Sequence, residues 1–352
     1  MSRKLVQIDL VKSIAILAVI VMHLSQDEWL ESVGYLFHLE QAVPVFVVVM
    51  GLTSGLSFSR CELFSLRDYF SRRFVRLVAP YVTLTVVTAA LQVLRSVLLG
   101  IHPWKVDIGW YTLVGIPPIE GPGTYFIGIA IQWSIIAPFV WLLYRRAPIT
   151  TVVILNVIGA AFMFAAPHVD ALASSQYLYS ANVIRYLGPI AIGLWLSDGW
   201  HLRQRRNWWL VPAAGAALVY NIARTRSGAN PIFPFLPSWE VHNFVSLLYA
   251  PMLVVLGMKF APSVATGHVV RALTVVGRAS YHIFLVQMVY FGVHLQSITH
   301  EAMLGVSGGP FAFVLAAVLT SLSCVILGVS WWKIEHGLLI RRLTTVEVAL
   351  AQ

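Results

Sequence analysis

Charged residues are scarce in this chain. They make up 11% of its 352 residues, whereas 58% are hydrophobic. An ordinary soluble domain carries about 25% charged residues, and the mean hydropathy here is +0.78. The composition therefore argues against a soluble globular protein and predicts an integral membrane protein, whose length is used by membrane-spanning helices rather than by a soluble core.

Cysteine is almost absent, with only two residues, Cys61 and Cys324, too few for a disulfide framework or a thiolate metal site. There is no His-Glu-x-x-His motif and no Cys/His cluster, so no metal is expected. A Gly-rich phosphate loop is also missing, which argues against ATP-driven chemistry. The net charge of +9 does not imply nucleic acid, because excess Lys and Arg in a membrane chain reflect topology and contact with anionic lipid.

Ten apolar segments are long enough to cross a bilayer, which takes about 20 residues per helix. They lie at residues 6–25, 35–58, 74–99, 124–144, 148–166, 180–198, 208–223, 241–259, 275–297 and 309–333. The first has no small-residue cleavage site after its apolar run, so we interpret it as a retained span rather than a signal peptide. The sequence predicts one all-α domain over residues 1–352, with about ten transmembrane helices.

Basic residues favour every second loop between these segments. They are Arg3, Lys4, Arg60, Arg67, Arg72, Arg73, Arg76, Arg145, Arg146, Arg203, Arg205, Arg206, Arg271, Arg341 and Arg342. Only Lys105, Arg224 and Arg226 depart from this pattern. Because cytoplasmic loops are enriched in Lys and Arg, both termini are predicted to be cytoplasmic. The protein is expected to be a multi-pass protein of the cell's inner or plasma membrane, in contact with the lipid bilayer.

Three ionisable side chains interrupt the first apolar segment. Lys12 and His23 lie within about 20° of each other around a helix and about 16 Å apart along its axis, and Asp9 lies about 40° from His23. Ionisable groups inside a span usually face a protein interior or a wet cavity, so this stripe is a candidate site. The structural alternative is that Asp9 neutralises Lys12 and that His23 only hydrogen-bonds a neighbouring helix.

Two further features are candidates for a site. His38 opens the second segment and is expected on the same side of the membrane as His23. The longest loop, residues 100–123, contains Trp104 and Trp110. These residues suit either an interfacial belt or part of a site for an external acceptor.

A dense basic cluster precedes the third segment, at Arg72, Arg73 and Arg76. Contact with lipid headgroups explains most such clusters. Arginine forks also suit phosphate, so the alternative is a polyanionic cytosolic ligand. Arg185 and Glu335 lie at or inside predicted spans, where a charge needs a partner, and they are candidates to pair with each other.

Several short motifs follow one another along the chain. The first is Asp-x-x-Lys-x10-His, formed by Asp9, Lys12 and His23. Later motifs are His38 with Pro44, Phe46 and Gly51; Arg72, Arg73 and Arg76 with Pro80 and Tyr81; Thr124-Tyr125-Phe126 with Gln132 and Pro138; Gly277 to Leu285; and Trp332 to Glu335. Together they resemble the acyltransferase-3 family of membrane O-acyltransferases, and most closely its fucose or exopolysaccharide O-acetylase branch. The chain departs from the family pattern at Met50, where Ser is usual, and at Gln287, where His is frequent.

The resemblance implies an acyl-CoA-dependent enzyme. The donor would be cytosolic acetyl-CoA, with its phosphates on Lys12, Arg72, Arg73 and Arg76 and its pantetheine arm directed toward His23. The acceptor would be a hydroxyl of a lipid-linked or growing polysaccharide, that is, a carbohydrate partner. His23 is then expected to act as general base, since an imidazole titrates near neutral pH, and Asp9, Lys12 and His38 are further candidate catalytic residues.

Other functions remain open at this point. A carrier or flippase for a sugar or amphiphile would use the same polar stripe as its path and would need no CoA. An acyltransferase could act instead on a small-molecule acceptor, or pass the acyl group through an acyl-histidine. The sequence does not indicate the oligomeric state.

Overall fold

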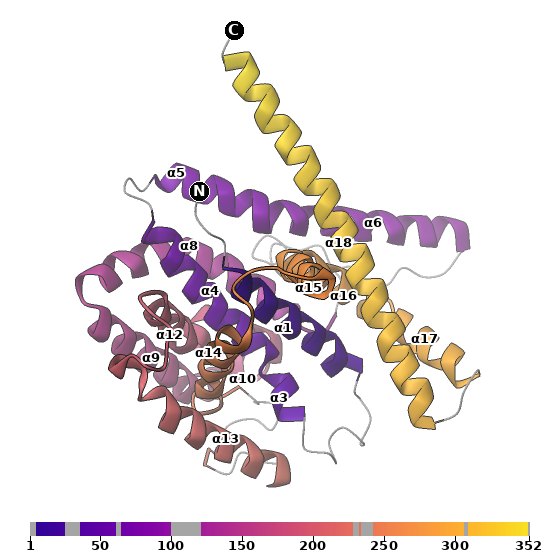
Figure 1. The fold of residues 1–352 in the computed structure, drawn as a ribbon. Coiled ribbons are helices and arrows are strands. Elements are labelled where there is room, and N and C mark those ends of the chain that lie inside the picture. Colours follow the sequence, from indigo (N-terminus) through magenta and orange to yellow (C-terminus); the bar gives the residue numbers. More distant parts are fainter. Residues whose placement is uncertain are drawn as a thin grey trace.

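The computed structural model describes residues 5–24, 36–60, 65–99, 121–227, 232–233, 242–305 and 309–350. Every regular element in these ranges is a helix (Figure 1). The all-α fold class expected from the sequence is therefore confirmed. The loop with Trp104 and Trp110 lies outside the described residues.

Four helices form the centre of the bundle. They are α1 (Val6–Leu24), α4 (Ala42–Phe58), α12 (Leu187–Ser197) and α14 (Tyr249–Phe260). A Cβ atom added to Gly51 of α4 would lie 2.1 Å from the Ile190 carbonyl oxygen. Glycine therefore lets the α4 and α12 backbones touch, which is typical of helix packing in membranes. Buried aliphatic side chains such as Leu52 and Leu194 fill the rest of this contact.

A second group of helices closes around α1. It comprises α15 (His268–Arg278), α16 (Ser280–Gly292), α17 (Leu295–Leu304) and α18 (Gly309–Leu350). α15 and α16 are bent by 70° relative to each other, and α1 packs against α15, α16 and α18.

The contact between α1 and α15 depends on Gly277. A Cβ atom there would lie 1.7 Å from the Asp9 carbonyl oxygen. The Gly277→Ala protein must therefore separate the two helices, and overpacking of this kind costs about 1–3 kcal/mol. We expect a thermal midpoint lower by roughly 5 °C in detergent, measured by fluorescence-detected size exclusion after heating. Gly215→Ala is the matched control, because its Cβ would meet nothing within 4 Å. Equal midpoints for the two variants would contradict this account.

The remaining helices surround this centre. They are α3 (Leu36–Glu40), α5 (Leu66–Arg73), the π-helical turn η1 (Phe74–Val78), α6 (Ala79–Leu99), α8 (Tyr125–Arg146), α9 (Pro148–Ala165), η2 (Ala166–His168), α10 (Asp170–Ala173), α11 (Gln176–Ser180), η3 (Val183–Tyr186), η4 (Arg205–Asn207), α13 (Leu210–Ser227) and η5 (Ser246–Leu248). α5, η1 and α6 follow one another as a single long rod across one end of the bundle (Figure 1).

Each of the ten predicted segments overlaps one or more helices within the described residues. Within the described residues, six helices are long and apolar enough to cross a membrane, and a seventh is obtained if α15 and α16 count as one broken span. The chain is therefore a membrane protein with several apolar helices. The count of ten stays a prediction, because α12 and α14 have only 11 and 12 residues.

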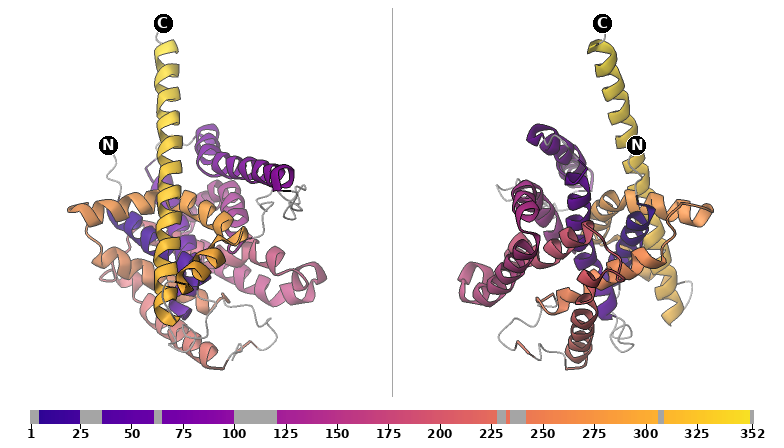
Figure 2. Two further views of the ribbon diagram at one scale, coloured as in Figure 1. Left: turned by 90° about the vertical axis from the view of Figure 1, so that its right-hand side faces the viewer. Right: turned by 60° about the vertical axis from the view of Figure 1, so that its left-hand side comes forward.

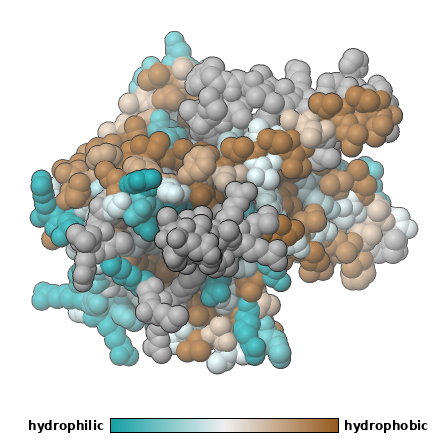
Figure 3. All heavy atoms as spheres, turned by 90° about the horizontal axis from the view of Figure 1, so that it is seen from above, coloured by the Kyte–Doolittle hydropathy of each residue, from teal (hydrophilic) through white to brown (hydrophobic). Residues whose placement is uncertain are grey.

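α1 begins and α18 ends on the same side of the molecule (Figures 1 and 2). α18 has 42 residues, and a helix of that length extends about 63 Å. The hydrocarbon core is about 30 Å thick, so α18 projects beyond the bilayer. Seen from the side on which α18 ends, the surface carries both hydrophilic and hydrophobic residues (Figure 3). Exposed residues such as Val86 and Val97 of α6 suit contact with lipid.

Candidate active site

A large cavity opens between α1, α4, η1, α16 and α18, on the side where α1 begins. Its volume is ≈ 720 Å³, within the range of about 300–1,000 Å³ that is typical of small-molecule sites. Its charged lining residues are Asp9, Lys12, Arg60, Arg73, Arg76, Arg278 and Glu335. Five of these seven side chains are cationic, so the cavity favours an anionic ligand.

Asp9 organises the cations on the α1 wall of this cavity. Its carboxylate lies 2.9 Å from Lys12 Nζ and 3.1 Å from Arg278 Nε. Asp9 and Lys12 are thus paired, as the structural alternative for the stripe predicts, and both still line the cavity. Since Arg278 comes from α15, the Asp9–Arg278 ion pair also joins the two helices that meet at Gly277.

Only two of the three arginines in the basic cluster line the cavity. Arg73 and Arg76 line the cavity, whereas Arg72 is exposed and is not part of the lining. Arg73 donates a hydrogen bond of 3.3 Å to the buried Ser54 hydroxyl, which also accepts one of 3.0 Å from Trp133 Nε1. Ser54 therefore holds the Arg73 guanidinium at the cavity wall.

Glu335 is paired with His282 rather than with Arg185. His282 Nε2 lies 2.6 Å from a Glu335 carboxylate oxygen, and both residues line the cavity. The expected Arg185–Glu335 pair is therefore wrong. His282 was not among the predicted site residues, although a histidine inside a predicted span is itself a signal of a functional site.

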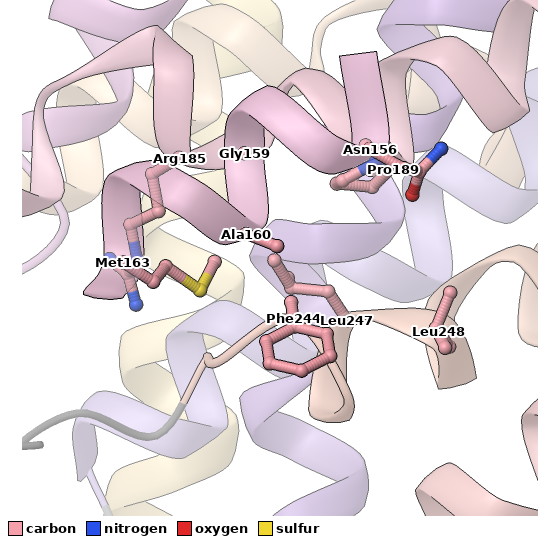
Figure 4. Close-up of a pocket in the computed structure, with 10 residues that line it drawn as sticks. Asn156, Gly159, Ala160, Met163, Arg185, Pro189, Phe244, Leu247 and Leu248 are labelled. Atoms are coloured by element: carbon pink, nitrogen blue, oxygen red, sulfur yellow. The ribbon is translucent and has the colours of Figure 1, made fainter. Parts of the chain in front are cut away.

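Arg185 instead lies in a separate buried site (Figure 4). Its guanidinium donates hydrogen bonds to Ser180 Oγ, Tyr186 Oη and the His242 carbonyl oxygen, at 3.3, 3.0 and 3.3 Å. It also lies 4.9 Å from the centre of the Tyr179 ring. The adjoining cavity measures ≈ 10 Å³, room for about one water molecule. Arg185 is thus held by polar and aromatic groups at a place too small for a substrate.

His23 lies near the end of α1, beyond the cavity. Its ring packs edge-on against Phe291 at 6.0 Å between centroids. A Cβ atom placed on Gly123 would lie 3.7 Å from His23 Nε2 and 3.2 Å from the Phe284 ring, so these two side chains are close neighbours. His23 Nε2 is buried and has no hydrogen-bond partner among the described residues. It is therefore available to a molecule that reaches this place.

Three aromatic rings lie next to one another in the wall of the cavity. Phe46 and Phe126 have ring centroids 5.9 Å apart, and Phe126 and Phe284 have centroids 5.5 Å apart. All three line the cavity, but His23 does not. We call Phe46, Phe126 and Phe284 the aromatic barrier. Phe284 thus lies both in the wall of the cavity and near the imidazole of His23.

The sequence matches the acyltransferase domain family over residues 5–329. The chain belongs to the acyltransferase-3 family. The comparisons with curated proteins and with solved structures gave no match. This membrane acyltransferase thus combines a cationic cavity on one side with a buried imidazole deeper in the bundle. The branch within the family stays a prediction.

His38 of the acyltransferase lies in α3, which packs against α1. Its side chain is exposed, and its Nδ1 lies 3.2 Å from the Tyr249 hydroxyl. His38 therefore belongs to a helix that contacts α1, and its role at the site stays a prediction. Across the described ranges, no group of three His, Cys, Asp or Glu side chains is placed to hold a metal ion.

Proposed function

We propose that this acyltransferase moves an acetyl group from cytosolic acetyl-CoA to a hydroxyl of a cell-surface or lipid-linked carbohydrate, in the inner or plasma membrane. The cationic cavity is the single observation that carries the proposal. It is large enough for an extended small molecule, and its cations suit the phosphates of CoA. Three of its cations, Arg60, Arg73 and Arg76, belong to or border a basic loop that is predicted to be cytoplasmic.

In this proposal the phosphates bind to the arginines at the cavity mouth. Arg60, Arg73 and Arg76 line the cavity and have no ion-pair partner within the described part of the chain. Lys12 serves less well as a phosphate ligand than the sequence suggests, because Asp9 already neutralises it. It would orient the ligand jointly with Asp9.

The pantetheine arm then spans the distance to the catalytic group. Along α1, Lys12 and His23 are separated by about 16 Å, and the intervening cavity wall is apolar, with Val19 and Phe126 among its residues. The arm displaces the Phe284 ring and brings the thioester to His23. This step places the acetyl group near the far end of α1, where an acceptor can approach from the other side.

His23 acts as the general base. Its Nε2 takes the proton of the acceptor hydroxyl as the hydroxyl oxygen attacks the thioester carbonyl carbon. The carbon–sulfur bond then breaks, and the CoA thiolate takes up that proton from the imidazolium. The products are an acetyl ester and CoA, and no metal is needed. Positioned bases typically contribute about 10²–10⁴-fold to the rate.

The proposal is tested by two measurements. Purified protein in nanodiscs is expected to bind acetyl-CoA in calorimetry. A strain that lacks the gene is expected to lose base-labile acetate from its surface glycans, measured by mass spectrometry, and to regain it on complementation. A protein that binds no CoA and whose loss leaves surface acetylation intact would instead favour a carrier. If only a free small molecule is acetylated, the acceptor is that small molecule and not a cell-surface or lipid-linked carbohydrate.

A further inference from the structure

Gln287 of α16 is a buried amide whose two ends lack partners. Its side chain is 0% exposed, and neither Nε2 nor Oε1 has a hydrogen-bond partner within the described part of the chain. A buried polar group without a partner costs free energy, so it calls for an explanation, of which a catalytic role is one. Both of its ends are available to a bound molecule.

Gln287 lies between the two rings that flank His23. Around the helix it is about 60° from Phe284 and about 40° from Phe291, and along the axis it lies about 4.5 Å beyond the first and about 6 Å before the second. Phe291 packs on the imidazole, and Phe284 lies beside it. The face of α16 that carries Gln287 therefore meets the end of α1 at His23.

Two unpartnered groups of complementary chemistry thus lie on α1 and α16, which pack against each other. The nitrogen of His23 can accept a proton, and the Gln287 amide can donate hydrogen bonds through Nε2. The flanking rings Phe284 and Phe291 belong to a hydrophobic cluster that also contains the buried Met288 and Ile20. In such a place a fixed donor stabilises developing negative charge far better than it would in water.

We propose that Gln287 is the oxyanion-binding residue of the acyl transfer, an inference that rests on the proposed function. Its Nε2 donates a hydrogen bond to the carbonyl oxygen of the donor's acyl group. When the acceptor oxygen bonds to the carbonyl carbon, the π electron pair of the carbonyl moves onto this oxygen, while the acceptor proton goes to His23. The amide then binds the oxyanion until the carbon–sulfur bond breaks and the pair returns.

This role differs from that of a residue that only supports the fold. A donor aimed at the oxyanion acts in the transition state and contributes little to binding of the ground state. Its loss is expected to lower kcat by about 10²–10³-fold, the usual effect of removing one oxyanion donor, and to change KM for acetyl-CoA by no more than about twofold. Loss of a packing residue would instead lower the yield of folded protein.

The test uses the full chain in nanodiscs with labelled acetyl-CoA as donor. The acceptor is a membrane extract, containing lipid-linked glycans, from the source strain without this gene. Gln287→Leu keeps the size of the side chain and removes both polar ends, whereas Gln287→His restores an N–H donor. Thr320→Val is the matched control, since Thr320 is also 0% exposed with an unpartnered hydroxyl.

We expect the kcat of the Gln287→Leu protein to fall by about 10²–10³-fold. The Gln287→His protein should retain at least about a tenth of the wild-type kcat, and the Thr320→Val protein should have the wild-type kcat. A Gln287→Leu protein with wild-type kcat would overturn the assignment while leaving the proposed function intact. The same holds if Gln287→His is as inactive as Gln287→Leu at normal thermal stability. If the wild-type protein transfers no acetyl group in this assay, both the assignment of Gln287 and the proposed function are refuted.

Discussion

The His23→Ala protein is expected to lose acetyl transfer by about 10²–10⁴-fold, at normal abundance in the membrane. The imidazole has a buried Nε2 without a partner in the described residues, so its removal breaks no hydrogen bond at that nitrogen. The variant should therefore fold, bind acetyl-CoA with unchanged affinity and fail in the chemical step. The measurement is ester-linked acetate on the surface glycans of a deletion strain that carries the variant.

His168→Ala is the control for this experiment. His168 ends η2 at an exposed position, so its loss should leave acetylation unchanged. Both variants are quantified in isolated membranes, which separates loss of chemistry from loss of protein. Undiminished acetylation by the His23→Ala protein would refute the role of general base and, with it, the path of the acyl group proposed above.

The Arg73→Ala/Arg76→Ala protein should bind acetyl-CoA at least about 100-fold more weakly. A hydrogen bond to a charged group contributes about 1.5–3 kcal/mol. Losing two such hydrogen bonds would weaken the affinity for acetyl-CoA by more than about 100-fold. Because the Arg76 side chain is exposed and solvent weakens the interactions of an exposed charge, we expect a loss near the lower end of this range. The measurement is the dissociation constant from calorimetry in nanodiscs, together with KM for acetyl-CoA.

Two controls make this second result specific. Arg145→Ala/Arg146→Ala removes two exposed arginines at the end of α8 that do not line the cavity, so it should bind as the wild type does. Acetylpantetheine, which has the thioester but lacks the nucleotide phosphates, should serve wild type and the Arg73/Arg76 variant about equally. A variant equally impaired with both donors would show that these arginines support the fold rather than the phosphates.

The sequence predicts the helices and the polar stripe because both depend on local order. Apolar runs of about 20 residues specify spans regardless of what they touch, and the Asp9–Lys12 pair follows from a spacing of three residues on one helix. The partners of these residues follow from no local pattern. Arg278 reaches Asp9 from 269 positions away, and it is placed there by the close packing of Gly277 on α1.

The position of the cavity could not be predicted from the sequence either. Its end is determined by where Phe46, Phe126 and Phe284 meet, and these rings belong to three different helices. The same holds for the pairing of Glu335 with His282, because the competing partner, Arg185, is engaged by Ser180 and Tyr186. Periodicity identifies which residues are costly to bury, but it does not specify which of them come together.

The aromatic barrier has a consequence for the membrane itself. An open, water-filled passage from the cationic cavity to the opposite surface would let protons and ions run down the electrical gradient that the cell maintains, at about 2.3 kcal/mol per charge for every 100 mV. If the pantetheine arm passes between these rings as proposed, the passage stays closed to ions before the arm enters and while it is bound. Such an enzyme can act across the bilayer without dissipating the membrane potential.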